Sequence, residues 1–377
     1  MASIEKRTRD SKTSWSARWR DPAGRQRKRS FARKTDAEHF LTGVEHSQLG
    51  GSYIDPAAGR LTVGQWSTRW LASQSHLKPS TRARYEGIVA RHVVARWGDV
   101  PLSGVSHADV AAWVTRLTAS GLAGSTVRYI HRVLALILAL AVKDGRLARN
   151  PATGVRLPKA ARAEKRYLTH EQVAALAEAA GDRGLVVLVL AYTGLRWGEL
   201  AGLRVKRVDL MRRRIEVAEA VTEVRGHLTW GTPKNHQRRS VPIPRSLVDD
   251  LAVHLAGKRP DELVFTSARG AVLRNLNFRR DVFDPAARAA GLDGLTPHEL
   301  RHTAASLGVS AGASVKSMQR MLGHASAAMT LDVYAGLFDD DLDAVADRLD
   351  AARAHPRVPL VCPDAAVVPI TVRETGA

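Results

Sequence analysis

The residues best suited to chemistry lie in five short segments of the second half of the chain. They read TGLRWGEL at 193–200, TPKNHQRRSVPIP at 232–244, TPHELRHT at 296–303, LGHAS at 322–326, and finally a tyrosine, Tyr334. Arginine, lysine, histidine and tyrosine together suit the breakage and rejoining of a phosphodiester. An enzyme that keeps the bond energy needs its own nucleophile, which holds the phosphate as a covalent ester. A tyrosine oxygen suits this, because a phenolate is also a good leaving group in the reverse step.

Such chemistry places demands on the neighbours of the tyrosine. Its unperturbed pKa is near 10, so it needs help to lose its proton at neutral pH. The transition state gathers negative charge on the non-bridging oxygens, and two fixed guanidinium groups stabilise that charge. Each residue alone has an ordinary explanation: Tyr334 as a core aromatic, and Arg196 as a surface salt-bridge partner. Their occurrence together and in order is what favours catalysis.

The composition indicates what these residues act on. The 377 residues carry 57 Lys+Arg against 37 Asp+Glu, a net charge of +20. A protein this basic most often meets a polyanion, and nucleic acid is the leading candidate. The single cysteine, Cys362, excludes a disulfide framework, and the first residues, MASIEKRTRD, lack the apolar core of a secretory signal. We therefore expect a cytoplasmic, nucleoid-associated protein.

Residues 1–55 predict a small DNA-binding module. The runs SWSARWR and RKRSFAR flank a turn with Pro and Gly, which predicts a β-hairpin, and a helix follows to about Gln48. Trp15, Trp19 and Phe31 supply a small core, whereas a solvated basic tail is the alternative. A sheet with arginines on one face suits a major groove. The predicted DNA contacts are Arg18, Arg20, Arg25, Arg27, Lys28 and Arg29.

The rest of the chain predicts two larger domains and a tail. Apolar spacing predicts helices at 63–74, 80–97, 107–120 and 123–144, which form a helical unit over 61–150. From 160 to 340 the pattern is mixed, with helices at 169–180, 183–193, 245–255, 275–290, 301–311, 315–322 and 330–334. Strands are predicted at 214–220, 220–224, 227–230 and 239–243. The fold class is therefore multidomain and mainly α, with an α+β domain, a small antiparallel sheet, and an acidic tail at 341–377.

Together the five segments resemble the catalytic domain of the tyrosine recombinase (phage integrase) family. They reproduce the family's order of Arg, Lys, His-x-x-Arg, His and Tyr. Residues 61–150 resemble its helical, SAM-like core-binding domain, and residues 1–55 resemble, more weakly, the arm-binding domain of its larger integrases. The resemblance implies six catalytic residues: Arg196, Lys234, His298, Arg301, His324 and Tyr334 (nucleophile).

The resemblance also implies a role for each of these positions. Arg196 and Arg301 match the pair that binds the phosphate, and Lys234 matches the mobile general acid that protonates the departing 5′ hydroxyl. His298 fits the acid/base position beside the nucleophile, and His324 the position that hydrogen-bonds the scissile phosphate. Arg238 or Arg239 are alternatives that can align in place of Lys234, because the loop around it varies in length.

Two further residues resemble supporting positions. Glu199 lies one helical turn after Arg196 and matches the acidic residue that supports the active site, and His302 follows Arg301 as structural or phosphate-adjacent support. Three histidines suggest a metal site as an alternative. No H-E-x-x-H arrangement is present and two arginines are poor neighbours for a dication, so no metal and no cofactor are expected.

The family's reaction implies the partners. It is site-specific recombination of double-stranded DNA at attachment sites, with core and arm sites, a 3′-phosphotyrosyl intermediate and a Holliday junction. Four strands imply a homotetramer in the synaptic complex, and a host DNA-bending protein and an excisionase are possible accessory partners. An arm-binding domain favours an integrase, which integrates and excises a phage or mobile element, over a chromosome-dimer resolvase.

Two other functions remain as alternatives. A type IB topoisomerase shares the Arg, Lys, Arg, His, Tyr chemistry but relaxes supercoils without pairing two sites. A sequence-specific DNA-binding protein with silent catalytic residues is the alternative from outside enzymology, and an intact set of six argues against it. The tail is either a segment that docks on a neighbouring protomer or a charge-balancing extension.

Overall fold

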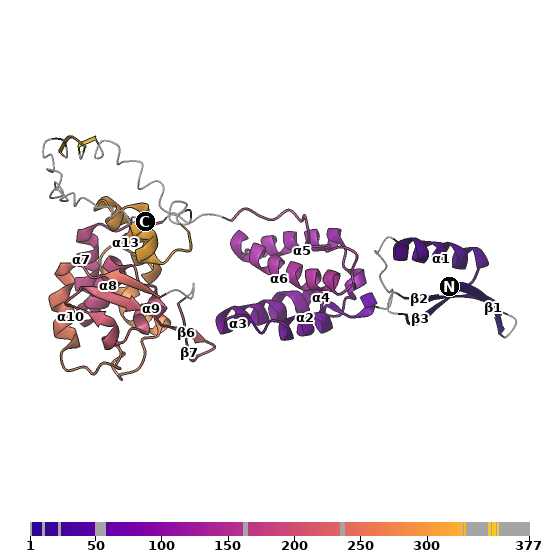
Figure 1. The fold of residues 1–377 in the computed structure, drawn as a ribbon, viewed down its shortest axis with the longest axis horizontal. Helices are drawn as coiled ribbons and strands as arrows, with labels where there is room; N and C mark the ends of the chain where they lie inside the picture. Colours follow the sequence, from indigo (N-terminus) through magenta and orange to yellow (C-terminus); the bar gives the residue numbers. More distant parts are fainter. Residues whose placement is uncertain are drawn as a thin grey trace, which may run out of the picture. The chain divides into compact units, whose positions relative to one another are not determined.

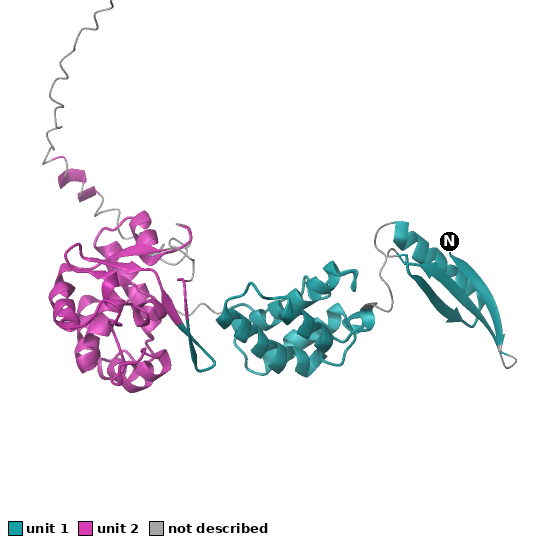
Figure 2. Ribbon diagram, turned by 60° about the horizontal axis from the view of Figure 1, so that its bottom comes forward, with its two compact units in different colours: residues 1–164, 222–229 teal, residues 165–221, 230–377 magenta. Residues whose placement is uncertain are grey.

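A computed structural model of the protein describes residues 2–9, 12–21, 24–49, 58–160, 165–233 and 238–326, with isolated positions at 328, 346, 347, 349–351 and 353 (Figure 1). The chain divides into two compact units (Figure 2). One comprises residues 1–164 with 222–229, and the other comprises residues 165–221 with 230–377. The first unit holds a small sheet-and-helix module and a helical bundle, and the second is mixed α and β.

The N-terminal module is a three-stranded antiparallel sheet covered by a helix on one face. Its elements are β1 (Ser3–Arg9), β2 (Lys12–Arg20), β3 (Gln26–Phe31) and α1 (Lys34–Leu49), with strand order β1-β2-β3. Ala17 and Trp19 of β2 are buried against Leu41 of α1. The ring of Phe40 lies 5.1 Å from that of Trp19 and 5.2 Å from that of Phe31, measured between centroids. Aromatic packing therefore holds the helix on the sheet.

The bundle that follows is built around one long apolar helix. Its helices are α2 (Val63–Ala72), α3 (Pro79–Ile88), α4 (Ala95–Trp97), α5 (His107–Ala119) and α6 (Gly124–Lys143), with a π-helical stretch at Val89–Val94. Among the described residues, α6 is the helix long and apolar enough to cross a membrane. Val133, Leu134 and Ile137 on it are fully buried, so α6 forms the core of this bundle.

The second unit packs helices around a fully apolar one. Its helices are α7 (His170–Ala179), α8 (Gly184–Thr193), α9 (Trp197–Ala201), α10 (Val248–Leu255), α11 (Asn275–Phe278), α12 (Asp284–Ala289), α13 (Pro297–Ser310) and α14 (Val315–Leu322). Short 3₁₀ turns of this unit lie at Gly181–Arg183, Val205–Arg207 and Arg245–Leu247, with a π-helical stretch at Arg279–Phe283; those of the first unit lie at Ala58–Arg60 and Leu102–Gly104. The sequence of α8, GLVVLVLAYT, is buried between α7 and α13. A helix with no polar face needs partners on both sides, which places α13 beside it.

The strands between α9 and α10 form two small sheets, and residues 222–229 of the second sheet belong to the first compact unit. The strands are β4 (Val208–Asp209), β5 (Arg214–Val217), β6 (Ala220–Val224), β7 (His227–Gly231) and β8 (Arg239–Pro242). The strand order is β4-β5-β8 in one sheet, and β6 pairs with β7 in the other. Ile215 and Val241 are register partners, and both are fully buried. Because β8 also contacts α14, it links the sheet to the helix that ends before His324.

The multidomain, mainly α architecture with small sheets is confirmed. The helices expected at 107–120 and 123–144 match α5 and α6 within one residue. The sequence also predicts that the strands at 227–230 and 239–243 form a hairpin with Lys234 on its turn. This pairing is wrong, because β7 and β8 belong to different sheets and β8 pairs with β5 instead. The helix expected from Arg301 begins earlier, at Pro297, so His298 and Arg301 share it.

Other differences have local causes. β1 was not expected, because SIEKRTR has a single apolar residue and an edge strand needs no alternating pattern. The helix expected over 275–290 contains the π-helical stretch directly before Asp284 and Pro285, and proline removes a backbone donor at that point. The helix expected over 330–334 and nearly all of the tail at 341–377 lie outside the described residues.

Candidate active site

Glu199 is the buried acidic centre of the site. It lies in the first turn of α9, and its side chain is 1% exposed. The backbone N–H of Arg196 donates to Glu199 Oε2 at 2.9 Å, and Arg196 Nη1 donates to Oε1 at 2.9 Å. The same carboxylate therefore caps the start of the helix and orients the guanidinium that precedes it.

Arg239, at the start of β8, makes a second and closer pair with Glu199. Its Nη1 lies 2.9 Å from Oε1 and its Nη2 2.6 Å from Oε2, in a bidentate arrangement. Burial by itself would raise the pKa of Glu199, but the hydrogen bonds and charge of Arg239, and then those of Arg196, hold it at about 2. Glu199 is thus an ionised carboxylate between two arginines across the physiological pH range.

Three arginines converge on three consecutive carbonyl groups at the C-terminal end of α14. A helix leaves its last carbonyls without partners inside the helix, so these oxygens need donors. The pairs are Arg239 Nε with the oxygen of Met321 at 2.9 Å, Arg301 Nη2 with the oxygen of Leu322, and Arg196 Nη2 with the oxygen of Gly323 at 3.4 Å. Two of these arginines are among the predicted catalytic residues, and the third is named by the sequence only as an alternative to Lys234.

Two glycines allow this close approach. Gly323 ends α14 in the left-handed conformation (φ +63°), and a Cβ there would lie 2.9 Å from Arg239 Cδ. Gly194 ends α8 with the same φ, and its carbonyl accepts from Arg301 Nη1. A Cβ on Gly194 would lie 2.7 Å from Leu322 Cδ2. Both positions require glycine, for conformation and for space.

His324 follows directly after the end of α14. The pKa of His324 is lowered to about 4. Burial is the largest cause, and the charges of Arg301 and then Arg196 add to it. At neutral pH the imidazole is therefore uncharged and serves as a hydrogen-bonding group beside two cations. The hydrogen bond to phosphate that the resemblance implies for His324 stays a prediction.

His298 and His302 lie one turn apart on α13, on either side of Arg301 in sequence. Their ring centroids are 5.1 Å apart, His298 is exposed, and His302 is partly buried. Burial lowers the pKa of His302 to about 4, with His298 and then Lys165 as further causes. The exposed His298 is the one of the pair that is accessible to a substrate proton.

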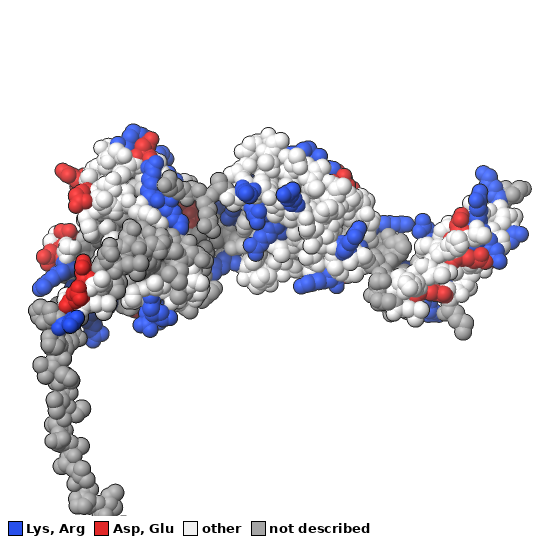
Figure 3. Space-filling view, turned by 90° about the horizontal axis from the view of Figure 1, so that it is seen from above, with Lys and Arg blue, Asp and Glu red and all other residues white. Residues whose placement is uncertain are grey.

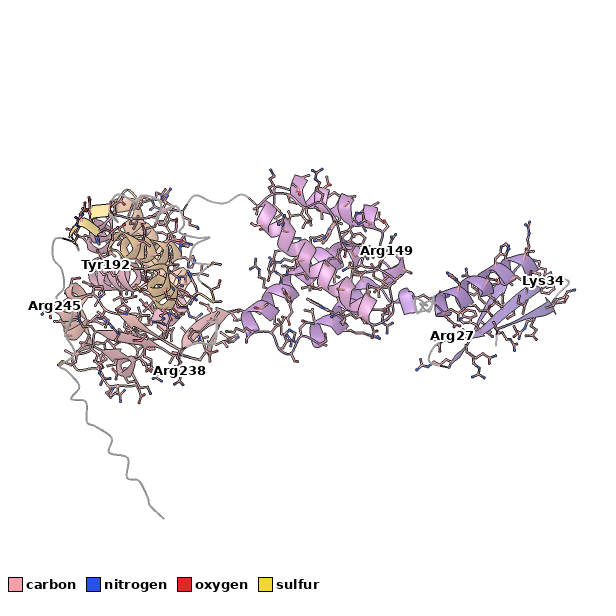
Figure 4. All side chains as sticks on the ribbon, turned by 45° about the horizontal axis from the view of Figure 1, so that its top comes forward. Arg27, Lys34, Arg149, Tyr192, Arg238 and Arg245 are labelled. Carbon is pink, nitrogen blue, oxygen red and sulfur yellow. The ribbon has the colours of Figure 1, made fainter. Side chains whose placement is uncertain are left out.

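A basic cleft opens beside these groups. It has a volume of about 390 Å³ and lies between β8 and the helix α14. The lining residues are Arg196, Pro233, Arg238, Arg239, Ser240, Lys316, Gln319, Arg320, Gly323 and His324. Five of these are Lys or Arg, and none is Asp or Glu. Arg238, labelled in Figure 4, is exposed, as are Lys316 and Arg320. The cleft therefore suits an anion.

Two of the six predicted catalytic residues, Lys234 and Tyr334, lie outside the described residues. The structure brings together Arg196, Arg301 and His324 of the remaining four, with the supporting Glu199. Arg239, which the sequence offered only as an alternative to Lys234, is committed to Glu199 and to the end of α14. A site for three or more His, Cys, Asp or Glu ligands around a metal is absent from the described part of the chain.

The structure divides the predicted DNA contacts of the N-terminal module between two faces. Ala17 and Trp19 face α1, and residues paired in register share a face. Arg29 and Arg27 pair with them and therefore lie on the helix side, where Arg29 packs over Phe31 at 5.2 Å. Arg27 also pairs with Asp21 at 3.0 Å.

The other predicted contacts of the module lie on the opposite face or in a turn. Arg20, Arg25 and Lys28 are exposed, whereas Arg18 is partly buried and pairs with Glu5 at 2.5 Å. Arg18 and Lys28 are register partners on the face opposite the helix, and Arg20 lies on that face too. Arg25 is exposed in the turn before β3. A common face for all six residues is therefore wrong, because alternation along β3 sends Arg27 and Arg29 to the side opposite Lys28.

Sequence reasoning missed the part that some residues play in the site. Lys316 and Arg320 read as an ordinary charged helix face, and Arg239 as one of two adjacent arginines before a strand. Lys316, Arg320 and Arg239 line the cleft only because β8 lies beside α14, which is a contact between segments far apart in the chain. Gly194 and Gly323 stood within the segments that carried the prediction, but their conformation appears only in the fold.

Comparison with known proteins places the chain in a family. Residues 166–340 match the model of the phage integrase family. A tyrosine recombinase XerC from Mycobacterium sp. (strain KMS) is 30% identical over 265 residues, which cover 65% of this chain and 81% of the relative.

Solved structures share the fold. The Tn1549 transposon integrase in complex with transposon right end DNA superposes with a TM-score of 0.68 at 23% identity, covering 77% of this chain and all of that one. A lambda integrase tetramer bound to a Holliday junction superposes with a TM-score of 0.57 at 19% identity, covering 85% of this chain and 95% of that one. With the family model and the XerC relative, these findings show that the chain is an enzyme of the tyrosine recombinase (phage integrase) family.

Proposed function

We propose that the protein is an integrase, which cuts and rejoins DNA at attachment sites through a covalent phosphotyrosine. The observation that carries this is the convergence of Arg196, Arg301 and His324 at the end of α14, at the edge of a cleft lined by cations. Both guanidinium groups are held by backbone carbonyls or by Glu199, so they are oriented before any substrate arrives. Groups fixed in advance stabilise developing charge without reorganising.

The proposed strand cleavage uses these groups together with Tyr334 and Lys234. The oxygen of Tyr334 attacks the scissile phosphorus, a 3′-phosphotyrosyl ester forms, and the bond to the 5′ oxygen breaks. Arg196 and Arg301 stabilise the charge on the non-bridging oxygens, and neutral His324 hydrogen-bonds one of them. Lys234 donates the proton to the leaving 5′ hydroxyl, and His298 exchanges the proton of the tyrosine. The 5′ hydroxyl of the partner strand then attacks the ester and releases the tyrosine.

Two exchanges of this kind pass through a Holliday junction and need four active sites, hence a homotetramer on DNA. The family likeness includes a tetramer on such a junction, in lambda integrase. Residues 61–150 are proposed to contact the core site together with the catalytic domain at 160–340. Lys and Arg dominate over Asp and Glu on the visible face of the helical bundle (Figure 3). A host DNA-bending protein and an excisionase are proposed partners that set the direction, and the tail at 341–377 is proposed to dock on a neighbouring protomer.

We propose that residues 1–55 bind an arm site through the open face of their sheet. That face presents Arg18, Arg20 and Lys28, whereas α1 covers the other. Replacing Arg18 and Lys28 with Gln should weaken binding of arm-site DNA by at least tenfold and leave cleavage of a core site nearly unchanged. Replacing Arg29 with Gln is the matched control, since Arg29 packs on Phe31. An equal loss of arm-site binding in both variants would exclude the open face as the reader.

A nicked suicide substrate tests the catalytic proposal. The DNA is built on repeats sought beside the coding sequence as candidate attachment sites, and the nick lets the short 5′ fragment diffuse away, which traps the ester. The wild type should form a covalent adduct and Tyr334→Phe should form none. A wild type that forms no adduct would overturn the proposal in favour of a silent DNA-binding protein. Relaxation of supercoils without joining of two different duplexes would instead select a type IB topoisomerase.

A further inference from the structure

We propose that Arg239 is a positioning residue, which holds Arg196 and the backbone before His324 in their working geometry without contacting the DNA itself. The assignment rests on the proposed function, since it concerns the same cleavage reaction. Arg239 stands at the first position of β8, five residues after Lys234.

The guanidinium of Arg239 uses every one of its nitrogens inside the protein. Nη1 and Nη2 bind the two oxygens of Glu199, and Nε binds the carbonyl of Met321. The side chain is only 9% exposed, compared with 23% for Arg196. A planar fork with three fixed partners has one orientation, and that orientation points toward the protein.

These contacts connect Arg239 to three separate elements of the site. Glu199 transmits its position to Arg196, because both arginines share the same two carboxylate oxygens. Arg239 also fixes the backbone before His324, because its Nε binds the carbonyl of Met321 and its Cδ packs against Gly323. β8 itself continues from the segment that contains Lys234. A displacement of Arg239 would therefore move a phosphate-binding arginine, a histidine and the strand after the general acid together.

The proposal separates Arg239 from its neighbour. Arg238 is exposed and lines the cleft, so a direct phosphate contact suits it. Lysine in place of Arg239 would keep the positive charge and lose the bidentate geometry. Charge and position can thus be tested apart.

The experiment compares Arg239→Lys and Arg239→Gln with the wild type on the suicide substrate. Both variants should cleave about 10- to 100-fold more slowly, as expected when reacting groups are misplaced. The Kd for uncleaved core-site DNA should stay within about threefold, which fits a residue that does not contact DNA. Arg279→Gln is the matched control, because it removes another bidentate arginine–carboxylate pair in the same unit, with Asp284, and should cleave at the wild-type rate.

A pH profile gives a readout that a merely structural role would not change. With Arg239 present the pKa of Glu199 is held at about 2. Burial raises that pKa once Arg239 is lost, so the decline of cleavage on the acid side should move to higher pH in Arg239→Gln. In the wild type, the decline of cleavage on the acid side should lie at a lower pH than in Arg239→Gln.

Four outcomes overturn the assignment. Wild-type rates in both variants would remove any role in cleavage, and full rescue by lysine would reduce the role to charge. A parallel loss of DNA affinity in folded variants would make Arg239 a DNA contact, and unfolding of both variants would leave it a stabilising residue only. Failure of the wild type to form an adduct is a different result, since it sinks the proposed function.

Discussion

Replacing Glu199 with Gln removes the charge at the centre of the site while keeping the size of the side chain. Glu199 lies between Arg196 and Arg239 with 1% of its side chain exposed. The variant leaves two guanidinium groups without their anion and turns an amide NH₂ toward one of them. Breaking a buried pair by removing one partner is among the costliest single changes.

The pKa of Glu199 gives the magnitude. It falls from 4.5 to about 2 in the folded protein. At about 1.4 kcal/mol per pKa unit, this favours folding by about 3 kcal/mol at pH 7. Since the folded pKa lies below the unfolded one, the contribution is complete above pH 4.5 and disappears as the pH falls through 2. At pH 3.5 about 2 kcal/mol should remain.

Urea unfolding measures this difference, with pulsed hydrogen exchange of peptides from α9 and α14 as the signal for the catalytic unit. Local signals are needed because a chain with several units does not unfold in one step. The control is Glu216→Gln, whose carboxylate pairs with Arg207 but is 44% exposed. It should cost less than about 1 kcal/mol.

Two results would refute the reasoning. A loss below about 1 kcal/mol for Glu199→Gln at pH 7 would mean that the carboxylate does not hold the two arginines. A loss that stays constant between pH 7 and pH 3.5 would mean that its charge is not the cause. Cleavage of the suicide substrate should fall in parallel, because Arg196 loses the partner that orients it.

Three further changes test the surroundings of the same helix end. Gly323→Ala should lower stability by about 1–2 kcal/mol, seen as a lower Tm, because φ is +63° and the new Cβ meets Arg239 at 2.9 Å; an unchanged Tm would contradict that contact. Lys316→Gln with Arg320→Gln should reduce the slope of log Kd against log salt for core-site DNA by up to about 2, and an unchanged slope would place the DNA outside the cleft. The pKa of His324 is lowered from 6.5 to about 4, because the folded protein disfavours the protonated imidazole. Its contribution to stability is therefore complete above pH 6.5 and is lost as the pH falls through 4. His324→Asn should therefore be less sensitive to acid than the wild type, by about 1 kcal/mol at pH 5 after solvent screening; equal sensitivity would refute the depressed pKa.

Much of the fold could be predicted from local patterns. Helices with a strong apolar stripe, such as α5 and α6, matched closely because burial of that stripe determines them. α9 was not expected as a helix of its own, since WGELA is five residues long and depends on Glu199 capping its first turn. Pairing of β8 with β5 rather than β7 could not be read from the strands, because short strands carry no partner information.

The candidate site shows the same limit. The identity of Arg196, Arg301 and His324 followed from their segments, whereas their shared dependence on the end of α14 did not. Arg27 and Arg29 were grouped with Lys28 by sequence, and the pleat of β3 separates them. Alternation along a strand separates neighbouring side chains, but which of its two faces is covered by a helix depends on packing between segments distant in the chain.

The end of α14 also sets the electrostatic problem that the site must solve. The C-terminus of a helix carries about half a negative charge from its aligned peptide dipoles, and it normally repels anions. Here that end adjoins the groups proposed to bind a phosphate, and each of its last three carbonyls is covered by a different arginine. Arg196 and Arg301 therefore act twice, since they attract the phosphate and mask a dipole that would oppose it, whereas Arg239 only masks the dipole. Loss of Arg196 or Arg301 should therefore weaken phosphate binding more than loss of an arginine that stands on an exposed strand.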